Sequence, residues 1–291
     1  MYKSRKEMLI YGLPGVLLIF IFVYFPLLLN FVNSFYQWNA FSTARIFIGL
    51  ENFKRLLNDP IIVTAFINNT LYAIISVIFQ CGLGLVFAAV LENKLFSKYQ
   101  GFFRTVYFVP AVMSMTVVGI LWQFVYHPSY GIVNPFLKLI GLQGLAMDWL
   151  GKSATAIYSV IFVSQWQSIG YIMLLFIVAI QKIPSEIYES AKIDGATGIK
   201  GFLYITVPLI KEMTLVTTVI TVIGAYKVFS EVYVMTAGGP GHATETLATY
   251  MYRVAFRSDE MGYASSISAL IFVVLFVLTL IQLKISKTNI K

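Results

Sequence analysis

Four polar or aromatic side chains interrupt an apolar run of the sequence, and their types suit a polar solute. Gln165, Trp166, Gln167 and Tyr171 all lie within residues 154–180. Flat aromatic faces can stack on the C–H face of a sugar, while amide groups bond its hydroxyls. We therefore predict that these residues line a solute pathway, with helix packing as the open alternative. Trp122, Gln123 and Tyr126 end the preceding run, where packing or an interfacial belt is favoured.

Two opposite charges lie in another apolar run, residues 209–235. Lys227 and Glu231 are four residues apart and would share one face of a helix. A charge in lipid is costly, so intramembrane ionisable residues usually face a bundle interior or a water-filled cavity. One interpretation is a mutually neutralising pair near the outer end of the span. The other is a pathway lined by Lys227, Glu231 and nearby Tyr226, and the two are compatible.

The sequence does not favour nucleotide or metal chemistry in this chain. Residues 146–153, AMDWLGKS, fit only a loose phosphate-loop pattern, with one glycine, a bulky Trp149 and no preceding strand. The two histidines, His127 and His242, are far apart and lack a cysteine or acidic cluster around them. The single cysteine, Cys81, cannot form an intrachain disulfide. We expect no cofactor in this chain.

The elements that must position these residues are membrane spans. The 291 residues are 58% hydrophobic and 12% charged, with a mean hydropathy of +0.79, which excludes an ordinary soluble domain. Apolar runs of about 20 residues or more can cross a hydrocarbon core of roughly 30 Å. We predict an all-α polytopic membrane protein, a single transmembrane domain over residues 1–291. Its six spans are expected at residues 8–32, 62–91, 105–126, 154–180, 209–235 and 263–283.

The basic residues orient these spans. With both termini inside, most of the 21 lysines and arginines fall on the inner side, at the two termini and in the connections 92–104 and 181–212. Lys227 alone lies within a span. This excess satisfies the positive-inside rule, so the net charge of +8 is explained by topology and needs no nucleic-acid partner.

The connection 181–208 is long, charged and patterned. Pro184 and Ser185 suit the start of a short helix, because the fixed φ of proline fits the first turn and serine can cap a free N–H. Ile187, Ala191 and Asp194 would share one face of this helix, and Gly195 suits its C-terminal end. A second short helix can follow from Thr197, and Pro208 opens the next apolar run. Helices this short are marginal alone, so we predict that a partner completes the segment.

These residues resemble the EAA loop of ABC-importer permeases. The matching residues are Glu189, Ser190, Ala191, Asp194, Gly195 and Ala196, followed by the run Ile205, Thr206, Val207 and Pro208. Ser190 in place of the first alanine and Val207 in place of leucine are mild departures. The resemblance implies that the loop is cytoplasmic and that its short coupling helix sits in a cleft of an ATPase subunit. An ordinary amphipathic loop helix is the alternative.

A second segment is similar to carbohydrate-uptake permeases related to the maltose and glycerol-phosphate systems. Residues 236–256 contain Thr-x-Gly-Gly-Pro, then Thr-Glu-Thr, then Ala-Phe. Further matches lie at residues 49–53, 69–70, 130–134 and Pro110, so the resemblance covers nearly the whole chain. By analogy with the maltose permease subunit, sugar contacts come from the fourth and fifth spans. That subunit's asparagines are not kept here, because Ala225, Lys227 and Val228 stand near those positions.

The resemblance implies the six-span permease fold of type I ABC importers. The chain would be one permease subunit in a bacterial-type cytoplasmic membrane, with both termini cytoplasmic. Its expected partners are a second homologous permease, an ATPase dimer that binds ATP and Mg²⁺, an extracytoplasmic solute-binding protein, a sugar or oligosaccharide, and membrane lipid. The chain itself would perform no bond chemistry.

Other function classes are weaker alternatives. A polyol or glycerol phosphate is the nearest, since Lys227 could meet an anion. An ion-coupled secondary transporter would need buried carboxylates or inverted repeats, and only Glu231 is present, without a repeat. An integral-membrane enzyme would need a catalytic cluster, and none stands out.

Overall fold

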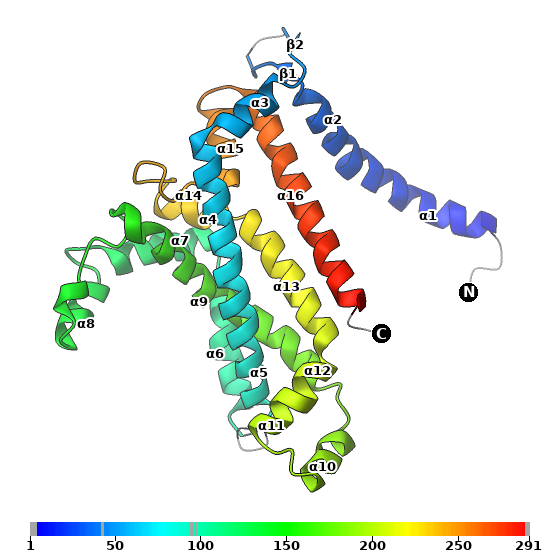
Figure 1. Cartoon of the computed structure of the whole chain (residues 1–291), viewed down its shortest axis with the longest axis vertical. Helices are drawn as coiled ribbons and strands as arrows, with labels where there is room; N and C mark the ends of the chain where they lie inside the picture. The colour runs from blue at the N-terminus through cyan, green and yellow to red at the C-terminus, as the bar shows by residue number, and fades with distance from the viewer. Residues whose placement is uncertain (1–4, 42–43, 94–95, 97, 289–291) are drawn as a thin grey trace. The chain divides into compact units, whose positions relative to one another are not determined.

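A computed structural model describes residues 5–41, 44–93, 96 and 98–288. Lys3, Lys94 and Lys291, which the orientation argument places inside, lie outside the described residues, as do both chain ends. The chain divides into two compact units, and the boundaries fall within the three helices α4, α15 and α16 (Figure 1). Unit 1 comprises residues 1–62 and 250–274, and unit 2 comprises residues 63–249 and 275–291.

Unit 1 carries the first apolar run and a small polar cluster. The first run is helical but interrupted by a π-helical segment, and Pro26 lies at the start of its last part. Two short strands pair antiparallel, with Tyr36 opposite Phe47. The elements are α1 (Arg5–Ile19), η1 (Phe20–Tyr24), α2 (Phe25–Asn33), β1 (Tyr36–Gln37), β2 (Ile46–Phe47), α3 (Glu51–Asn58), the start of α4 (Pro60–Ser76), most of α15 (Leu247–Phe256) and the start of α16 (Met261–Thr288).

Asp59 joins the elements of unit 1. Its carboxylate accepts hydrogen bonds from the hydroxyls of Tyr250 (2.6 Å) and Tyr263 (2.7 Å), and its other oxygen accepts one from the backbone N–H of Ile61 (2.9 Å). The Arg55 guanidinium lies 4.0 Å from the centre of the Tyr263 ring. Burial alone would raise the pKa of Asp59, but these hydrogen bonds outweigh it and lower the pKa below its ordinary value. Asp59 is therefore held as a carboxylate.

Unit 2 is a bundle of helices. The 62–91 run is one long rod in which the π-helical segment η2 separates two α-helical parts. The elements are the rest of α4, η2 (Val77–Leu83), α5 (Gly84–Leu91), α6 (Gln100–Val112), α7 (Met115–Tyr126), α8 (Val133–Leu139), η4 (Gln143–Leu145), α9 (Ser153–Ile180), α10 (Ser185–Ile193), α11 (Ile199–Gly201), η5 (Phe202–Thr206), α12 (Val207–Leu209), α13 (Lys211–Tyr226), α14 (Ser230–Met235), the start of α15 and the rest of α16.

The long central helix α9 organises unit 2. Its buried face packs against α5 and η2 around a core that includes Phe176, Met173 and Cys81. Two glycines allow close approach. A Cβ atom on Gly84 would lie 3.3 Å from the backbone nitrogen of Met173, and one on Gly170 would overlap the carbonyl oxygen of a residue in α6. In lipid, such small residues are what let helices pack tightly.

The chain is an all-α polytopic membrane protein. Five helical segments in the described residues are long and apolar enough to cross a membrane: Tyr11–Asn33, Pro60–Leu91, Ser153–Ile180, Lys211–Met235 and Met261–Ile285. The third predicted span, 105–126, differs from the expectation of one helix, because α6 and α7 meet at a bend of 97° and count as a sixth span only if taken together. The bend follows Pro110, and the amide of Gln167 donates to the freed carbonyl of Met113 (2.9 Å).

Candidate functional site

A polar cavity of about 200 Å³ lies inside unit 2, between η2 with the adjoining end of α4, α9, α13 and α14. At ~30 Å³ per water molecule, it has room for about seven waters or one sugar-sized group. Glu231 is the charged residue of its lining within the described chain. The lining residues are Tyr72, Ser76, Gln80, Ser164, Ser168, Tyr171, Ile172, Ile220, Thr221, Gly224, Ala225 and Glu231.

Helical periodicity brings these hydroxyl and amide groups together. Tyr72 and Ser76 are four residues apart on α4, and Ser164 and Ser168 are four apart on α9, so each pair lies on one helix face. Gln80 comes from the π-helical segment η2, a kind of segment that often occurs at functional sites. The polar face of each helix turns toward the same space, as expected for groups that would be costly in lipid.

Glu231 reaches the cavity because the fifth apolar run is broken. The helix α13 ends at Tyr226 and α14 begins at Ser230, so the expectation that Lys227 and Glu231 share a helix face is wrong. Glu231 is half-buried and accepts a hydrogen bond from the hydroxyl of Tyr72 at 3.0 Å, whereas Lys227 is exposed. Within the described residues the two form no salt bridge.

Side chains from elsewhere in the sequence satisfy the backbone at this break. The amide of Asn69, which is 0% exposed, donates to the carbonyl of Ala225 (2.7 Å) at the end of α13. Its oxygen accepts from the N–H of Leu247 (2.9 Å). The hydroxyl of Thr246 donates to the carbonyl of Val228 (3.0 Å). The break thus leaves these buried carbonyls paired, as a membrane interior requires.

The Gly-Gly-Pro loop is tied into the same network. The hydroxyl of Thr244 lies 2.7 Å from that of Thr236 and donates to the carbonyl of Gly239 (2.8 Å). The amide of Asn68 donates to the carbonyls of Ala243 (2.9 Å) and Glu245 (2.8 Å). We name this set of bonds, from Asn68 and Asn69 to residues 225–247, the helix-break network.

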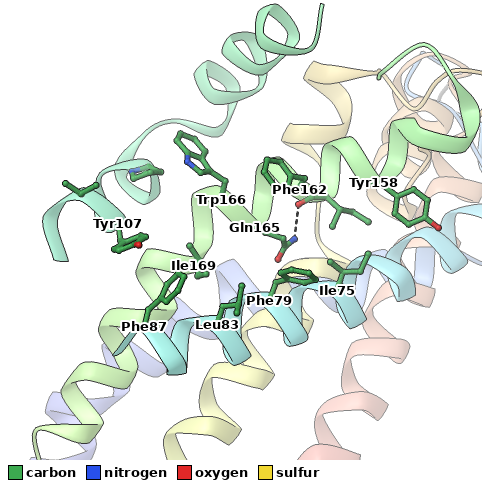
Figure 2. A pocket seen from close by; sticks show the side chains of 13 residues that line it. Ile75, Phe79, Leu83, Phe87, Tyr107, Tyr158, Phe162, Gln165, Trp166 and Ile169 are labelled. Carbon is green, nitrogen blue, oxygen red and sulfur yellow. Dashed lines mark hydrogen bonds between the residues drawn. The ribbon is translucent and has the colours of Figure 1, made fainter. Parts of the chain in front are cut away.

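Four of the seven predicted pathway residues line two different cavities in the structure. Tyr171 and Glu231 line the polar cavity. Gln165 and Trp166 instead face an apolar groove of about 600 Å³ with Phe79 and Phe162, as Figure 2 shows. This groove suits hydrocarbon better than a solute rich in hydroxyl groups.

Three of the predicted side chains, Gln165, Gln167 and Tyr226, make hydrogen bonds within the protein. The amide of Gln165 donates to Ile161 O (2.9 Å, dashed in Figure 2) and to the Ser76 hydroxyl (3.1 Å). Gln167 is buried at the bend between α6 and α7, as described above. Tyr226 is also buried, with its hydroxyl 2.9 Å from that of Thr70.

Sequence reasoning missed most of the cavity lining. The missed residues are Tyr72, Ser76, Gln80, Ser164, Ser168 and Thr221. For all of them except Thr221, which lies in a third run, the signal was a polar residue at every fourth position within an apolar run, a spacing that a helical wheel would have revealed.

The segment 181–208 forms the short helix that its sequence predicts. The helix α10 begins at Ser185, carries Glu186 in its first turn and Lys192 in its last, and ends before Gly195, which has a φ of +78°. The N–H of Ala196 donates to Ala191 O (2.8 Å) and that of Gly195 to Lys192 O (3.1 Å), the Schellman pattern. No side chain caps the N-terminus, so the expected role of Ser185 as a cap is wrong.

Contacts at its inner side hold α10 in place and leave its outer side open. Ala191 is buried, and the Tyr188 hydroxyl lies 2.9 Å from that of Thr206 in η5. The remaining EAA-like residues of the helix and its end are exposed: Glu189, Ser190, Asp194 and Gly195, with Ala196 half-buried. Pro208, in α12, is exposed as well. Figure 1 shows α10 at the end of unit 2 remote from α14.

Apolar side chains surround this exposed helix. Ile193 is 89% exposed and Ile199 is 78% exposed, and Leu203 and Tyr204 are exposed beside them. We name these four residues the apolar rim of α10. Exposed apolar groups clustered around a polar helix are typical of a protein-binding surface.

The loose phosphate-loop pattern has a structural role. The side chain of Asn134 accepts hydrogen bonds from the N–H of Met147 (3.2 Å) and the indole of Trp149 (2.9 Å), which folds the loop onto α8. Within the part of the chain that the structure describes, no three histidine, cysteine or acidic side chains are grouped so that they could hold a metal ion.

Comparison with known proteins agrees with this architecture. The family model described as "Binding-protein-dependent transport system inner membrane component" matches residues 80–290. The probable ABC transporter permease protein YurN of Bacillus subtilis is 50% identical over 277 residues, 95% of each chain. The lactose transport system permease protein LacF of Rhizobium radiobacter is 34% identical over 92% of this chain and 90% of its own. A solved bacterial ABC transporter involved in importing the acidic polysaccharide alginate is similar in fold, with a TM-score of 0.85 at 24% identity over 99% of this chain and 98% of its own.

Proposed function

Because the chain belongs to the binding-protein-dependent transport system inner membrane components, we propose that it forms, with a second homologous permease, the membrane pathway of an ABC importer for a sugar or oligosaccharide. It is a permease subunit and a multi-pass membrane protein. The polar cavity between η2, α9, α13 and α14 supports the solute part of the proposal, because its hydroxyl and amide groups match those of a saccharide.

The energy would come from partner subunits. We assign the binding of ATP and Mg²⁺ to an ATPase dimer, and we propose that this dimer docks on α10. The observation that carries this assignment is the exposed α10 with its apolar rim, since Ile193 at 89% exposure is costly to leave in water. Glu189, Ser190, Asp194 and Gly195 would then face the ATPase, while the buried Ala191 and half-buried Ala196 keep the segment folded and Pro208 begins the short helix α12.

The orientation follows the basic residues. Lys182, Lys192 and Lys200 cluster around α10, which supports a cytoplasmic location for this segment and, through the number of spans, for both termini. The membrane would be a bacterial-type cytoplasmic membrane, with an extracytoplasmic binding protein delivering the solute to the opposite side. Closure of the ATPase dimer would move α10, and the helices that follow it would open the cavity outward.

The alternatives from the sequence are less well supported. For a glycerol phosphate, Lys227 would have to meet the anion, but the charged group that lines the cavity is the carboxylate of Glu231. An ion-coupled transporter does not agree with the family to which the chain belongs.

The test is ATP hydrolysis by the importer reconstituted with its binding protein and a panel of sugars. In Glu189→Lys and Ile193→Asp variants, we expect assembly of the permeases but at least a tenfold loss of sugar-stimulated hydrolysis, because an unpaired or repelled group at a docking site costs more than ~1.4 kcal/mol. Glu212→Lys, an exposed residue outside α10, is the matched control and should be neutral. Normal stimulation in both α10 variants would refute the coupling role.

A further inference from the structure

The carboxyl group of Glu231 lines the polar cavity, and the described residues that line this cavity include no lysine, arginine or histidine. The break between α13 and α14 turns Glu231 inward and leaves Lys227 exposed. Among the described residues no lysine, arginine or histidine forms a salt bridge with Glu231, and its carboxyl group accepts a hydrogen bond from the hydroxyl of Tyr72 at 3.0 Å. A carboxylate inside a membrane is costly unless a cation or several donors compensate it.

The other groups around the cavity cannot supply that charge. Ser76, Ser164 and Thr221 offer hydroxyls and Gln80 offers an amide, all of which are neutral. These groups suit the hydroxyls of a sugar ring, and the ring of Tyr171 offers a face for its C–H groups. The site therefore combines neutral groups that match a sugar with one carboxyl group whose ionised form matches a cation.

We propose that the transported solute is a sugar carrying a protonated amine, and that Glu231 binds this amine. The proposal rests on the transport function inferred above and adds the charge of the substrate. A protonated amine would replace the missing cation and form a charge-assisted hydrogen bond with the carboxylate. A neutral sugar would leave the carboxylate uncompensated, and an acidic sugar would be repelled.

The helix-break network makes this specificity depend on backbone geometry. An unbroken helix would place Glu231 on the same face as Lys227, where the two charges would neutralise each other. Asn69 and Thr246 bind the carbonyls that the break frees, which keeps the carboxylate in the cavity and away from the lysine. Glu231 is thus a specificity-determining residue positioned by this network.

The test measures binding of matched amine and N-acetyl sugars to the assembled importer in lipid nanodiscs, by calorimetry without the binding protein. Glucosamine and galactosamine carry the charge, whereas N-acetylglucosamine and N-acetylgalactosamine have the same rings without it. We expect the wild type to prefer at least one amine over its acetylated partner by about tenfold or more, as a charge-assisted hydrogen bond gives. Glucuronate should bind more weakly than either.

Three variants separate the role of the charge from a structural role. Glu231→Gln keeps the acceptor for Tyr72 and should remove the amine preference, whereas Glu231→Asp keeps the charge and should retain part of it. Glu212→Gln, which removes an exposed carboxylate, should bind like the wild type. Equal or better binding of the acetylated sugars, no amine binding at all, or a preference that survives in Glu231→Gln would overturn the proposal.

The transport function is judged separately. If solute-stimulated ATP hydrolysis requires α10 but the amine preference is absent, the charge assignment is wrong and the importer function stands. If hydrolysis is not coupled to any solute through α10, the function proposed above fails irrespective of the binding results.

Discussion

Replacing Asn69 by leucine should destabilise unit 2 by an amount that the structure allows us to work out. Asn69 is 0% exposed, and its side chain pairs the carbonyl of Ala225 and the N–H of Leu247. Leucine has the same branching and the same number of side-chain heavy atoms but bulkier methyl groups, so it removes both hydrogen bonds and leaves no room for water to replace them. Each unpaired buried group costs about 1–3 kcal/mol, so we expect a loss of about 2–6 kcal/mol.

Thermal unfolding of the purified protein in detergent is the assay. With a shift of about 2–4 °C per kcal/mol, the melting temperature should fall by at least ~4 °C. Asn58→Leu is the matched control, because Asn58 is exposed and bonds only its own helix through Lys54 O. Equal melting temperatures for Asn69→Leu and the wild type would refute the idea that this side chain holds the helix break.

Two further changes test packing and charge. Gly170→Ala should lower the free energy of unfolding by about 1–3 kcal/mol, because its Cβ would overlap the backbone of α6. Gly82→Ala is the control and should leave stability unchanged, since a Cβ there would have nothing within 4 Å. Equal losses of thermal stability in the two variants would contradict the close approach at Gly170. Asp59 has a lower pKa in the folded protein than in the unfolded chain, where it is about 3.9. Its bonds to Tyr250 and Tyr263 therefore stabilise unit 1 fully at a pH above the unfolded-state pKa. This stabilisation is lost as the pH falls through the folded-state pKa. Melting curves between about pH 6 and pH 2 should therefore decline less in Asp59→Asn than in the wild type, and parallel declines would count against this.

The sequence predicts those parts of the fold that local chemistry decides. Apolar length marks the spans, and Gly195 ends α10 where a left-handed residue is needed. It does not predict the break after Tyr226, because residues 226–229 contain no glycine or proline and remain apolar apart from Lys227. The side chains that stabilise the break are Asn69, which is far away in the sequence, and Thr246, which follows the Gly-Gly-Pro loop. No local sequence pattern therefore predicts the break.

The same reason explains which site residues were misplaced. Gln165 and Tyr171 are polar residues in the same apolar run. Their angular positions on α9 decide that Gln165 lines the apolar groove and Tyr171 lines the polar cavity. Lys227 and Glu231 were paired by assuming a continuous helix. Tyr171 and Glu231 lie in the cavity, and whether either binds solute stays a prediction.

The helix-break network also bears on how a transporter of this kind could change its cargo. The polar side chains of the network donate hydrogen bonds to backbone carbonyls of the chain itself; they are Asn68, Asn69, Thr244 and Thr246. We therefore expect these side chains to shape the Gly-Gly-Pro loop and not to bind solute. The architecture and the choice of cargo therefore depend on different side chains. Engineering a new cargo should leave this loop unaltered and vary only the groups that face the cavity.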